Sequence, residues 1–337
     1  MAVVFMEGFD HLSGAQVSLK GWNSTQGTMT AGRFGGQASS SNGTMTGFGK
    51  ALPGSYTTAV CGFAFKNNLG VTTNPVFAFR NGAASGGTIV VAMRNVTSGS
   101  NTVLGLFNAA GTQLALGTTP YLGMATWVYA EIKVVVSATV GTVELRLDGA
   151  STAECSATGV NTGALDITSV SWQWVNGQAA YLDDIYVVDT SGSAPTNTWL
   201  GDVRVETLYP SANGTNTAWT GVYTDVDDPA TFDSDTTYIS SATPNDLETY
   251  GMTNLSMATG TVFAVQTSLV ARKDDAGFRT IAPVIRTGGT NYAGTTTAAL
   301  VSSYLDYTQL YDRQDPVAAD WSVTTVNGME VGVKEVA

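Results

Sequence analysis

Apolar and polar residues alternate with a period of two along much of this chain, the pattern of β-strands that bury one face. Residues 142–148, Thr-Val-Glu-Leu-Arg-Leu-Asp, show it most clearly. The preceding run, residues 127–136, has the same pattern and is joined to it by a short turn. The two runs therefore predict an antiparallel hairpin.

More runs of this kind are bounded by Gly, Asn, Ser or Thr residues: 59–65, 76–80, 88–94, 102–107 and 181–188. Regularly spaced short strands are typical of sandwiches and jelly rolls, so we predict an all-β fold. Helical spacing is nearly absent. Only two short helices are predicted, one starting at Pro244 after a Thr243 cap and one over residues 323–329.

A boundary between two domains is predicted near residue 190. Residues 189–198 are small and polar and include a proline, which is typical of a linker. An alternating run, residues 201–210, then opens a new series of strands. We therefore assign a jelly-roll sandwich to residues 1–190, a linker to 191–200, and a smaller β-sandwich-like domain to 201–337.

Composition and charge exclude several classes of protein. The 337 residues are 43% hydrophobic, enough to bury a large core, and carry a net charge of -12. Without clustered Lys and Arg, nucleic acid and anionic membrane surfaces are not expected partners. No basic and apolar leader opens the chain, and no apolar run of about 18 residues occurs. We expect a protein made in the cytoplasm without a signal peptide and not inserted into a membrane.

Scarce His and Cys residues exclude further chemistry. His11 is the only histidine, and Cys61 and Cys155 are the only cysteines, so a His-rich zinc site or a CxxC pair cannot form. Both cysteines lie in apolar, strand-like surroundings and are expected to be buried free thiols. A Ser-His-Asp triad is not expected, because no Gly-x-Ser-x-Gly motif is present.

Four carboxylates are candidate ligands for a structural calcium ion. Glu7 and Asp10 follow the first predicted strand, and Asp183 and Asp184 lie in the strand that closes the first domain. The four side chains would meet if these terminal strands pair, and hard cations prefer several oxygen ligands. The alternative is that these carboxylates accept hydrogen bonds from backbone amides in turns.

The first ~190 residues resemble the concanavalin A-like, laminin-G-type lectin/glucanase sandwich. The resemblance rests on residues 5–10, Phe-Met-Glu-Gly-Phe-Asp, on the hairpin of 127–133 with 143–149, and on residues 181–189. It implies a lectin-like sandwich. The Glu-x-Asp-x-Glu strand motif of the glucanase members is absent, so an enzyme is not expected.

The rest of the chain is similar to the C-terminal part of tailed-bacteriophage virion proteins. The matching stretches are 200–210, Trp219 with 226–228 and 235–238, 271–277 with 281–286, and 321–333. This resemblance implies a non-enzymatic virion structural protein, such as a tail-tip, fibre or decoration appendage. The expected partners are other copies of the chain, as a trimer, other virion proteins and host-surface polysaccharide.

A lectin role calls for aromatic and amide side chains that bind sugar. Trp22, Asn23 and Trp174 are the candidate glycan-binding residues, although each tryptophan is also a candidate for the core. One alternative function is a polysaccharide depolymerase that uses Glu144 with Asp148, or the pair Asp183 and Asp184. The other is a purely architectural capsid or tail component.

Overall fold

The chain is nearly all β and divides into two compact units, Met1–Val205 and Glu206–Ala337, in a computed structural model. The all-β fold predicted from the alternating pattern is confirmed. The structure describes residues 3–14, 16–23, 28–41, 48–67, 74–120, 126–173, 180–229, 232–294, 298–314 and 319–336.

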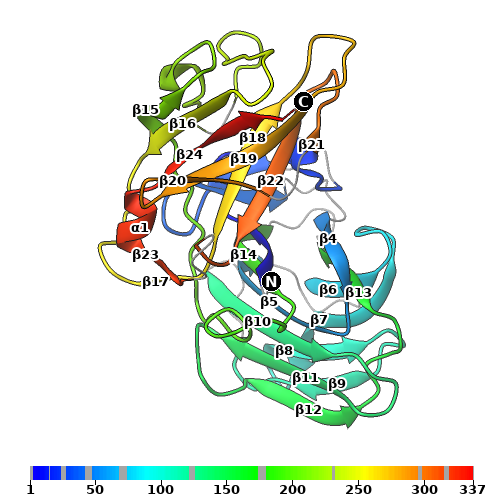
Figure 1. Cartoon of the computed structure of the whole chain (residues 1–337). Helices are drawn as coiled ribbons and strands as arrows, with labels where there is room; N and C mark the ends of the chain where they lie inside the picture. Colours follow the sequence, from blue (N-terminus) through cyan, green and yellow to red (C-terminus); the bar gives the residue numbers. More distant parts are fainter. Residues whose placement is uncertain are drawn as a thin grey trace. The chain divides into compact units, whose positions relative to one another are not determined.

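The first unit, coloured blue to green in Figure 1, consists of two antiparallel sheets. The eight-stranded sheet has the order β12-β11-β10-β5-β14-β3-β2, with β1 also paired to β14, and the six-stranded sheet has the order β4-β13-β6-β7-β8-β9. The strands of the eight-stranded sheet are β1 (Val3–Glu7), β2 (Thr28–Ala31), β3 (Gln37–Ser41), β5 (Thr58–Asn67), β10 (Val128–Val135), β11 (Gly141–Leu147), β12 (Cys155–Val160) and β14 (Ala180–Val188). Those of the six-stranded sheet are β4 (Phe48–Tyr56), β6 (Phe77–Asn81), β7 (Thr88–Ser98), β8 (Asn101–Asn108), β9 (Gln113–Leu116) and β13 (Ile167–Trp172).

The core of this unit lies between the two sheets. Alternate residues of each strand point inward, as the period of two requires. Phe63 of β5 packs across the core against Phe77 of β6, with ring centroids 4.9 Å apart, and against Trp172 of β13 at 5.4 Å. Cys61 and Cys155 are buried free thiols, and burial raises the pKa of Cys155 to about 12. This agrees with the sequence-based expectation for both residues.

The hairpin predicted from residues 127–136 and 142–148 is β10 paired with β11. The terminal strands also pair, because β1 runs antiparallel to the second half of β14 while β3 pairs with its first half. Between these two partners β14 bulges at Asp183 and Asp184, and Asp184 adopts a left-handed conformation with φ 51°.

Residues 201–205 belong to the first unit, although the sequence analysis placed them in the second domain. The predicted strand over 201–210 is wrong, since residues 201–209 form no strand and β15 begins only at Pro210. The Val205 amide instead donates to the Asp184 carboxylate at 2.8 Å, and the Leu200 and Gly201 amides donate to Glu131. Buried carboxylates therefore hold this segment against the sandwich, which moves the boundary to residue 205.

The second unit is built around a sheet of the order β15-β16-β24-β19-β20, with β21 also paired to β19. Two separate strand pairs, β17 with β23 and β18 with β22, complete it. Val265, Ile285 and Trp321 are among its core residues. The strands are β15 (Pro210–Thr217), β16 (Leu247–Met252), β17 (Thr261–Val262), β18 (Val265–Ala271), β19 (Thr280–Thr287), β20 (Thr290–Ala293), β21 (Ala298–Ala299), β22 (Leu305–Tyr311), β23 (Trp321–Ser322) and β24 (Glu330–Glu335).

One of the two predicted helices is present. Helix α1 (Val323–Asn327) begins at a Ser322 cap, whose hydroxyl accepts a hydrogen bond from the Thr325 amide, as a helix N-terminus requires. The predicted helix at Pro244 is wrong. The chain turns there and enters β16 at Leu247, because the partner strand β24 supplies backbone hydrogen bonds that a single helical turn cannot match.

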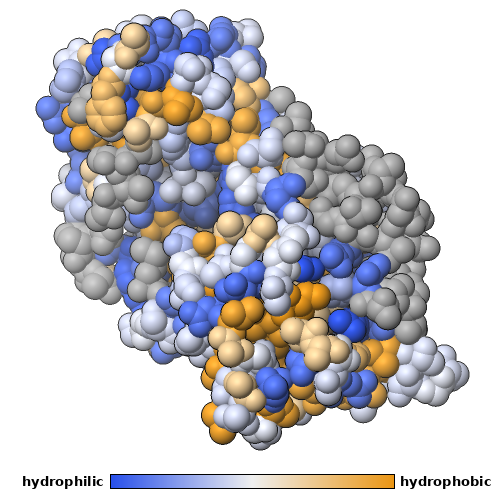
Figure 2. Space-filling view, turned by 90° about the vertical axis from the view of Figure 1, so that its right-hand side faces the viewer, coloured by the Kyte–Doolittle hydropathy of each residue, from blue (hydrophilic) through white to orange (hydrophobic). Residues whose placement is uncertain are grey.

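Hydrophobic residues do not form one continuous surface on the face drawn in Figure 2. In the part of that face that is not grey, orange patches are broken up by hydrophilic and neutral residues. Large hydrophobic side chains that are exposed include Phe34 at 52% and Phe278 at 72%.

Candidate functional site

The sequence-predicted glycan-binding residues do not form a surface site. Trp22 is only 3% exposed, and its ring stacks on Phe48 with centroids 4.2 Å apart. Asn23 is exposed, but its side-chain oxygen accepts a hydrogen bond from the Gly49 amide at 2.6 Å. Trp174 lies outside the described residues. The assignment of Trp22 as a sugar platform is therefore wrong, because its ring is part of the core.

Glu7, one of the candidate calcium ligands, is held by a buried lysine. Its side chain points into the sandwich, where it pairs with the Lys20 ammonium at 3.1 Å and accepts a hydrogen bond from the Trp22 indole at 3.3 Å. The same ammonium lies 3.0 Å from the His11 ring nitrogen. A cation of the protein itself therefore neutralises this carboxylate.

This buried network predicts a pH-dependent effect of Lys20. Burial by itself raises the pKa of Glu7, but Lys20, His11 and a hydrogen bond from Phe9 lower it to about 2, against 4.5 in the unfolded chain. Below pH 4.5 the unfolded state therefore binds more protons at Glu7 than the folded state does. The stability that the ionised Glu7 contributes is lost as the pH falls towards 2. Burial and Lys20 lower the pKa of His11 to about 4, against 6.5 in the unfolded chain. Below pH 6.5 this difference also lowers the free energy of unfolding as the pH falls.

Lys20→Met removes the largest contribution that lowers the pKa of Glu7, while burial still raises it, so the pKa rises and the charge becomes a cost at neutral pH. We expect the difference in unfolding free energy between wild type and Lys20→Met to be largest near pH 7 and to shrink towards pH 2. Urea unfolding across this pH range measures it, with the half-buried Lys133→Met as control. A difference that does not depend on pH would contradict the assignment.

Asp10, Asp183 and Asp184 form a second network, apart from the Lys20 pair. Asp10 accepts a hydrogen bond from the Gln37 amide at 2.7 Å, and Asp183 accepts one from the Arg33 amide at 2.8 Å. Burial and the neighbouring carboxylates raise the pKa of both Asp183 and Asp184. The Arg33 guanidinium lies 3.8 Å from Asp184 and supplies the nearby positive charge.

These four carboxylates do not fit a calcium site. Within the described ranges, no group of three His, Cys, Asp or Glu side chains is placed to hold a metal ion. Glu7 is separated from the others by its pairing with Lys20, and the aspartates accept hydrogen bonds from backbone amides. The alternative interpretation, carboxylates that fix turns and strand ends, describes them better.

The carboxylates considered for a depolymerase are also engaged in structural contacts. Glu144 pairs with Arg146 of the same strand at 2.7 Å, and Asp148 accepts a hydrogen bond from the Tyr129 amide at 2.8 Å. Asp183 and Asp184 are buried, with exposures of 4% and 2%. Cleavage of a glycosidic bond needs two carboxyl groups that face the substrate, which the enclosed pair Asp183 and Asp184 does not provide.

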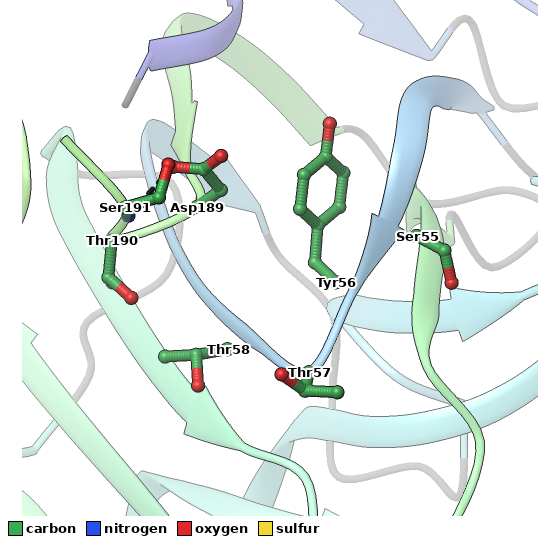
Figure 3. Close-up of a pocket in the computed structure, with 7 residues that line it drawn as sticks. All are labelled: Ser55, Tyr56, Thr57, Thr58, Asp189, Thr190 and Ser191. Atoms are coloured by element: carbon green, nitrogen blue, oxygen red, sulfur yellow. Dashed lines mark hydrogen bonds between the residues drawn. The ribbon is translucent and has the colours of Figure 1, made fainter. Parts of the chain in front are cut away.

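An open pocket of about 290 Å³ lies where the turn between β4 and β5 meets the end of β14 (Figure 3). Hydroxyl groups dominate its lining, and its one carboxylate, Asp189, accepts hydrogen bonds from the amide and hydroxyl of Ser191. Burial and Asp189 raise the pKa of Tyr56. The lining contains no base paired with a nucleophile. It consists of Ser55, Tyr56, Thr57, Thr58, Asp189, Thr190 and Ser191.

The stronger candidate site is a row of side chains that crosses the outer face of the eight-stranded sheet. Strand pairing places Lys66 opposite Tyr181, Tyr181 opposite Ser40, and Ser40 opposite Thr28. Trp127, just before β10, continues this row beyond Lys66. We call these five residues the aromatic row. Since adjacent strands are about 4.8 Å apart, the row extends roughly 20 Å across the sheet.

The centre of the aromatic row combines two rings and one positive charge. The Trp127 and Tyr181 rings meet edge to face with centroids 6.3 Å apart, and both are half-buried. The Lys66 ammonium lies 4.9 Å from the first centroid and 4.6 Å from the second, which is the range of cation–π contacts. Among the described residues, neither the ammonium nor the Tyr181 hydroxyl has a hydrogen-bond partner.

This arrangement suits a polar ligand with flat apolar faces. Trp and Tyr rings offer rigid apolar surface, and the ammonium and hydroxyl groups beside them supply hydrogen bonds. Sequence reasoning missed the row because Trp127 and Tyr181 were each read only as the first residue of a strand. The period of two could have predicted that Trp127 lies on the outer face of the sheet. It places Trp127 on the same face as Tyr129, opposite the core-facing Val128 and Ala130.

Comparison with known proteins finds no matching family model and no matching curated protein. Among solved structures, the exoplasmic/lumenal domain of VIP36 in its Ca2+/Man3GlcNAc-bound form is 12% identical, with a TM-score of 0.36, and the match covers 56% of this chain and 92% of that domain. Lectin I from Ulex europaeus, in complex with the methyl glycoside of alpha-L-fucose, is 12% identical over 55% of this chain and 97% of the lectin, with a TM-score of 0.32.

The alginate lyase Aly36B is a further similar structure, at 10% identity and a TM-score of 0.35. It covers 56% of this chain, and the chain covers 97% of the lyase.

Proposed function

We propose that this protein is a non-enzymatic structural protein of a bacteriophage virion, in a tail-tip, fibre or decoration appendage, and that its N-terminal sandwich attaches the particle to host-surface polysaccharide. The observation that carries the attachment role is the aromatic row on the outer face of the eight-stranded sheet. Rings flanked by donors that have no hydrogen-bond partner among the described residues are what a sugar chain needs, since each sugar has an apolar face and a rim of hydroxyl groups.

The virion part of the proposal rests on the sequence resemblance of residues 200–333. In this role the second unit serves assembly with other virion proteins, and the chain forms a trimer. No helix of the described residues is long and apolar enough to span a membrane. Assembly in the host cytoplasm is part of the same proposal.

The test is binding of labelled protein to a panel of bacteria and to their purified surface polysaccharides. We expect saturable binding to a narrow set of strains, competed by free polysaccharide. Trp127→Ala should weaken binding at least tenfold, about 1.4 kcal/mol, because it removes one ring and the surface under Lys66. The matched control is Trp199→Ala, which removes a half-buried tryptophan that contacts a different cation, Arg146, at 4.3 Å.

Each outcome of this experiment separates the proposal from its alternatives. Release of reducing ends from the polymer would support the depolymerase instead. Absence of binding by a folded, assembled sample would support a purely architectural role. Because the described residues form no metal site, chelation of calcium should leave both binding and melting temperature unchanged. Equal losses in Trp127→Ala and Trp199→Ala would remove the aromatic row as the site.

A further inference from the structure

The outer face of the six-stranded sheet carries two arginines that have no acidic partner in the part of the chain that the structure describes. Phe79 and Met93 point into the core, so their strand neighbours Arg80 and Arg94 lie on the opposite face. No ion pair joins either guanidinium to a carboxylate among the described residues. Six other arginines do form such pairs: Arg33, Arg146, Arg272, Arg279, Arg286 and Arg313.

Both guanidinium groups are partly withdrawn from water, which is costly for a charge without a counter-charge. Arg80 is 5% exposed and donates to the Ser171 hydroxyl and to the Gly87 carbonyl, each at 2.6 Å. Burial alone lowers the pKa of Arg80 and of Arg94, and no nearby acid opposes it. Among the described residues, neither guanidinium therefore has a carboxylate as its counter-charge.

Arg94 is the less satisfied of the two. Its guanidinium lies 4.8 Å from the centroid of the Phe107 ring, and its buried Nε has no hydrogen-bond partner among the described residues. The Nη1 atom points towards the turn between β8 and β9, since a Cβ added at Gly111 would lie 3.9 Å from it. That turn is exposed, so an outside ligand can reach this end of the side chain.

The strand register sets the spacing of the two charges. Ala78 of β6 lies opposite Ala92 of β7, and each arginine lies two residues further along its own strand, in opposite directions. At about 3.3 Å per residue and 4.8 Å between strands, their Cα atoms are roughly 14 Å apart. This is longer than one sugar ring, so one ligand group cannot engage both arginines.

We propose that Arg94, with Phe107 beneath it, is a binding subsite for an oxyanion of an acidic saccharide chain. Carboxylate, sulfate and phosphate groups share the chemistry that a guanidinium recognises with paired N–H donors. The inference goes beyond the attachment role proposed above, since it concerns the other sheet of the sandwich and names a charged class of ligand.

The charge of the whole protein makes this inference easy to test. A chain with a net charge of -12 repels polyanions at long range, so retention on one requires a local cationic site. Contact with an oxyanion is weakened by added salt, whereas stacking on an aromatic ring is not.

The experiment compares the full-length protein on polygalacturonate, dextran sulfate and neutral dextran by affinity electrophoresis, with inorganic phosphate as a free competitor. We expect binding to at least one acidic polymer, about tenfold tighter than to dextran and weakened by salt. Arg94→Ala should abolish this preference, and Arg94→Lys should lose most of it, because lysine lacks the paired donors. Retention on only one acidic polymer, or competition by phosphate, identifies which oxyanion is bound.

The control is Arg272→Ala, which changes the net charge equally but removes a guanidinium already paired with Asp235 at 2.8 Å. It should bind like wild type. Equal binding of wild type to dextran and to both acidic polymers would overturn the proposal, as would an Arg94→Lys protein with wild-type thermal unfolding and an unchanged preference. Trp127→Ala distinguishes the two proposals, because it should leave the salt-dependent preference intact.

Discussion

Replacing Trp22 by alanine should lower the unfolding free energy by about 3–5 kcal/mol, the usual cost of deleting a buried aromatic side chain. The ring is stacked on Phe48 and lies within 6.1 Å of the Trp172 ring, centroid to centroid. Its indole N–H also donates to Glu7, so the alanine variant takes a donor from a buried carboxylate. A loss of this size is a large fraction of the stability of a typical domain.

Urea unfolding followed by circular dichroism measures the effect, because it does not depend on the deleted fluorophore. Trp22→Phe is the matched variant, since it keeps most of the ring and loses the hydrogen bond to Glu7. It should cost about 2 kcal/mol. Polysaccharide binding by the folded fraction of Trp22→Ala should be unchanged. A variant that keeps full stability but loses binding would restore Trp22 as a surface residue.

The local alternation of apolar and polar residues was sufficient to predict most strands of the first unit. The period of two in residues 127–148 predicted β10, β11 and their pairing, because one buried face and a short turn together fix a hairpin. The same period could have placed Glu7 correctly. Phe5 and Glu7 lie on the same face of β1, and both are buried. A carboxylate in that position requires a buried cation, which Lys20 supplies.

The positions that sequence reasoning missed depend on contacts between distant segments. Trp22 lies outside any regular strand, and a single bridge to Lys50 of β4 places it in the core. The acidic pair Asp183 and Asp184 lies at a bulge with a left-handed residue, which no alternation predicts. The aromatic row likewise arises only when β10, β5 and β14 become neighbours, since their residues are far apart in the sequence.

Glu131 is expected to control how the segment before the domain boundary is held. This residue of β10 is 1% exposed, and its carboxylate accepts hydrogen bonds from the Tyr186 hydroxyl and from the amides of Leu200 at 3.1 Å and Gly201 at 2.8 Å. Glu131→Ala removes the acceptor that these three donors share, and the Leu200 amide keeps only a 3.2 Å hydrogen bond to the Tyr186 hydroxyl. We expect it to cost about 3–5 kcal/mol, as for the loss of one partner in a buried charged network.

We expect the loss of stability to appear first in residues 199–205 and only then in the whole unit. Hydrogen exchange at the Leu200 and Gly201 amides should accelerate, and trypsin should cleave after Arg204 faster than in wild type, because residues 199–205 lose a principal anchor on the sandwich. Glu131→Gln should have a smaller effect, since its amide oxygen can still accept hydrogen bonds. Glu144→Ala is the control on the neighbouring strand β11, where the carboxylate pairs only with the half-exposed Arg146. If Glu131→Ala leaves exchange and cleavage as in wild type, the segment is held by the Val205 contact to Asp184 instead, and Asp184→Asn should then release it.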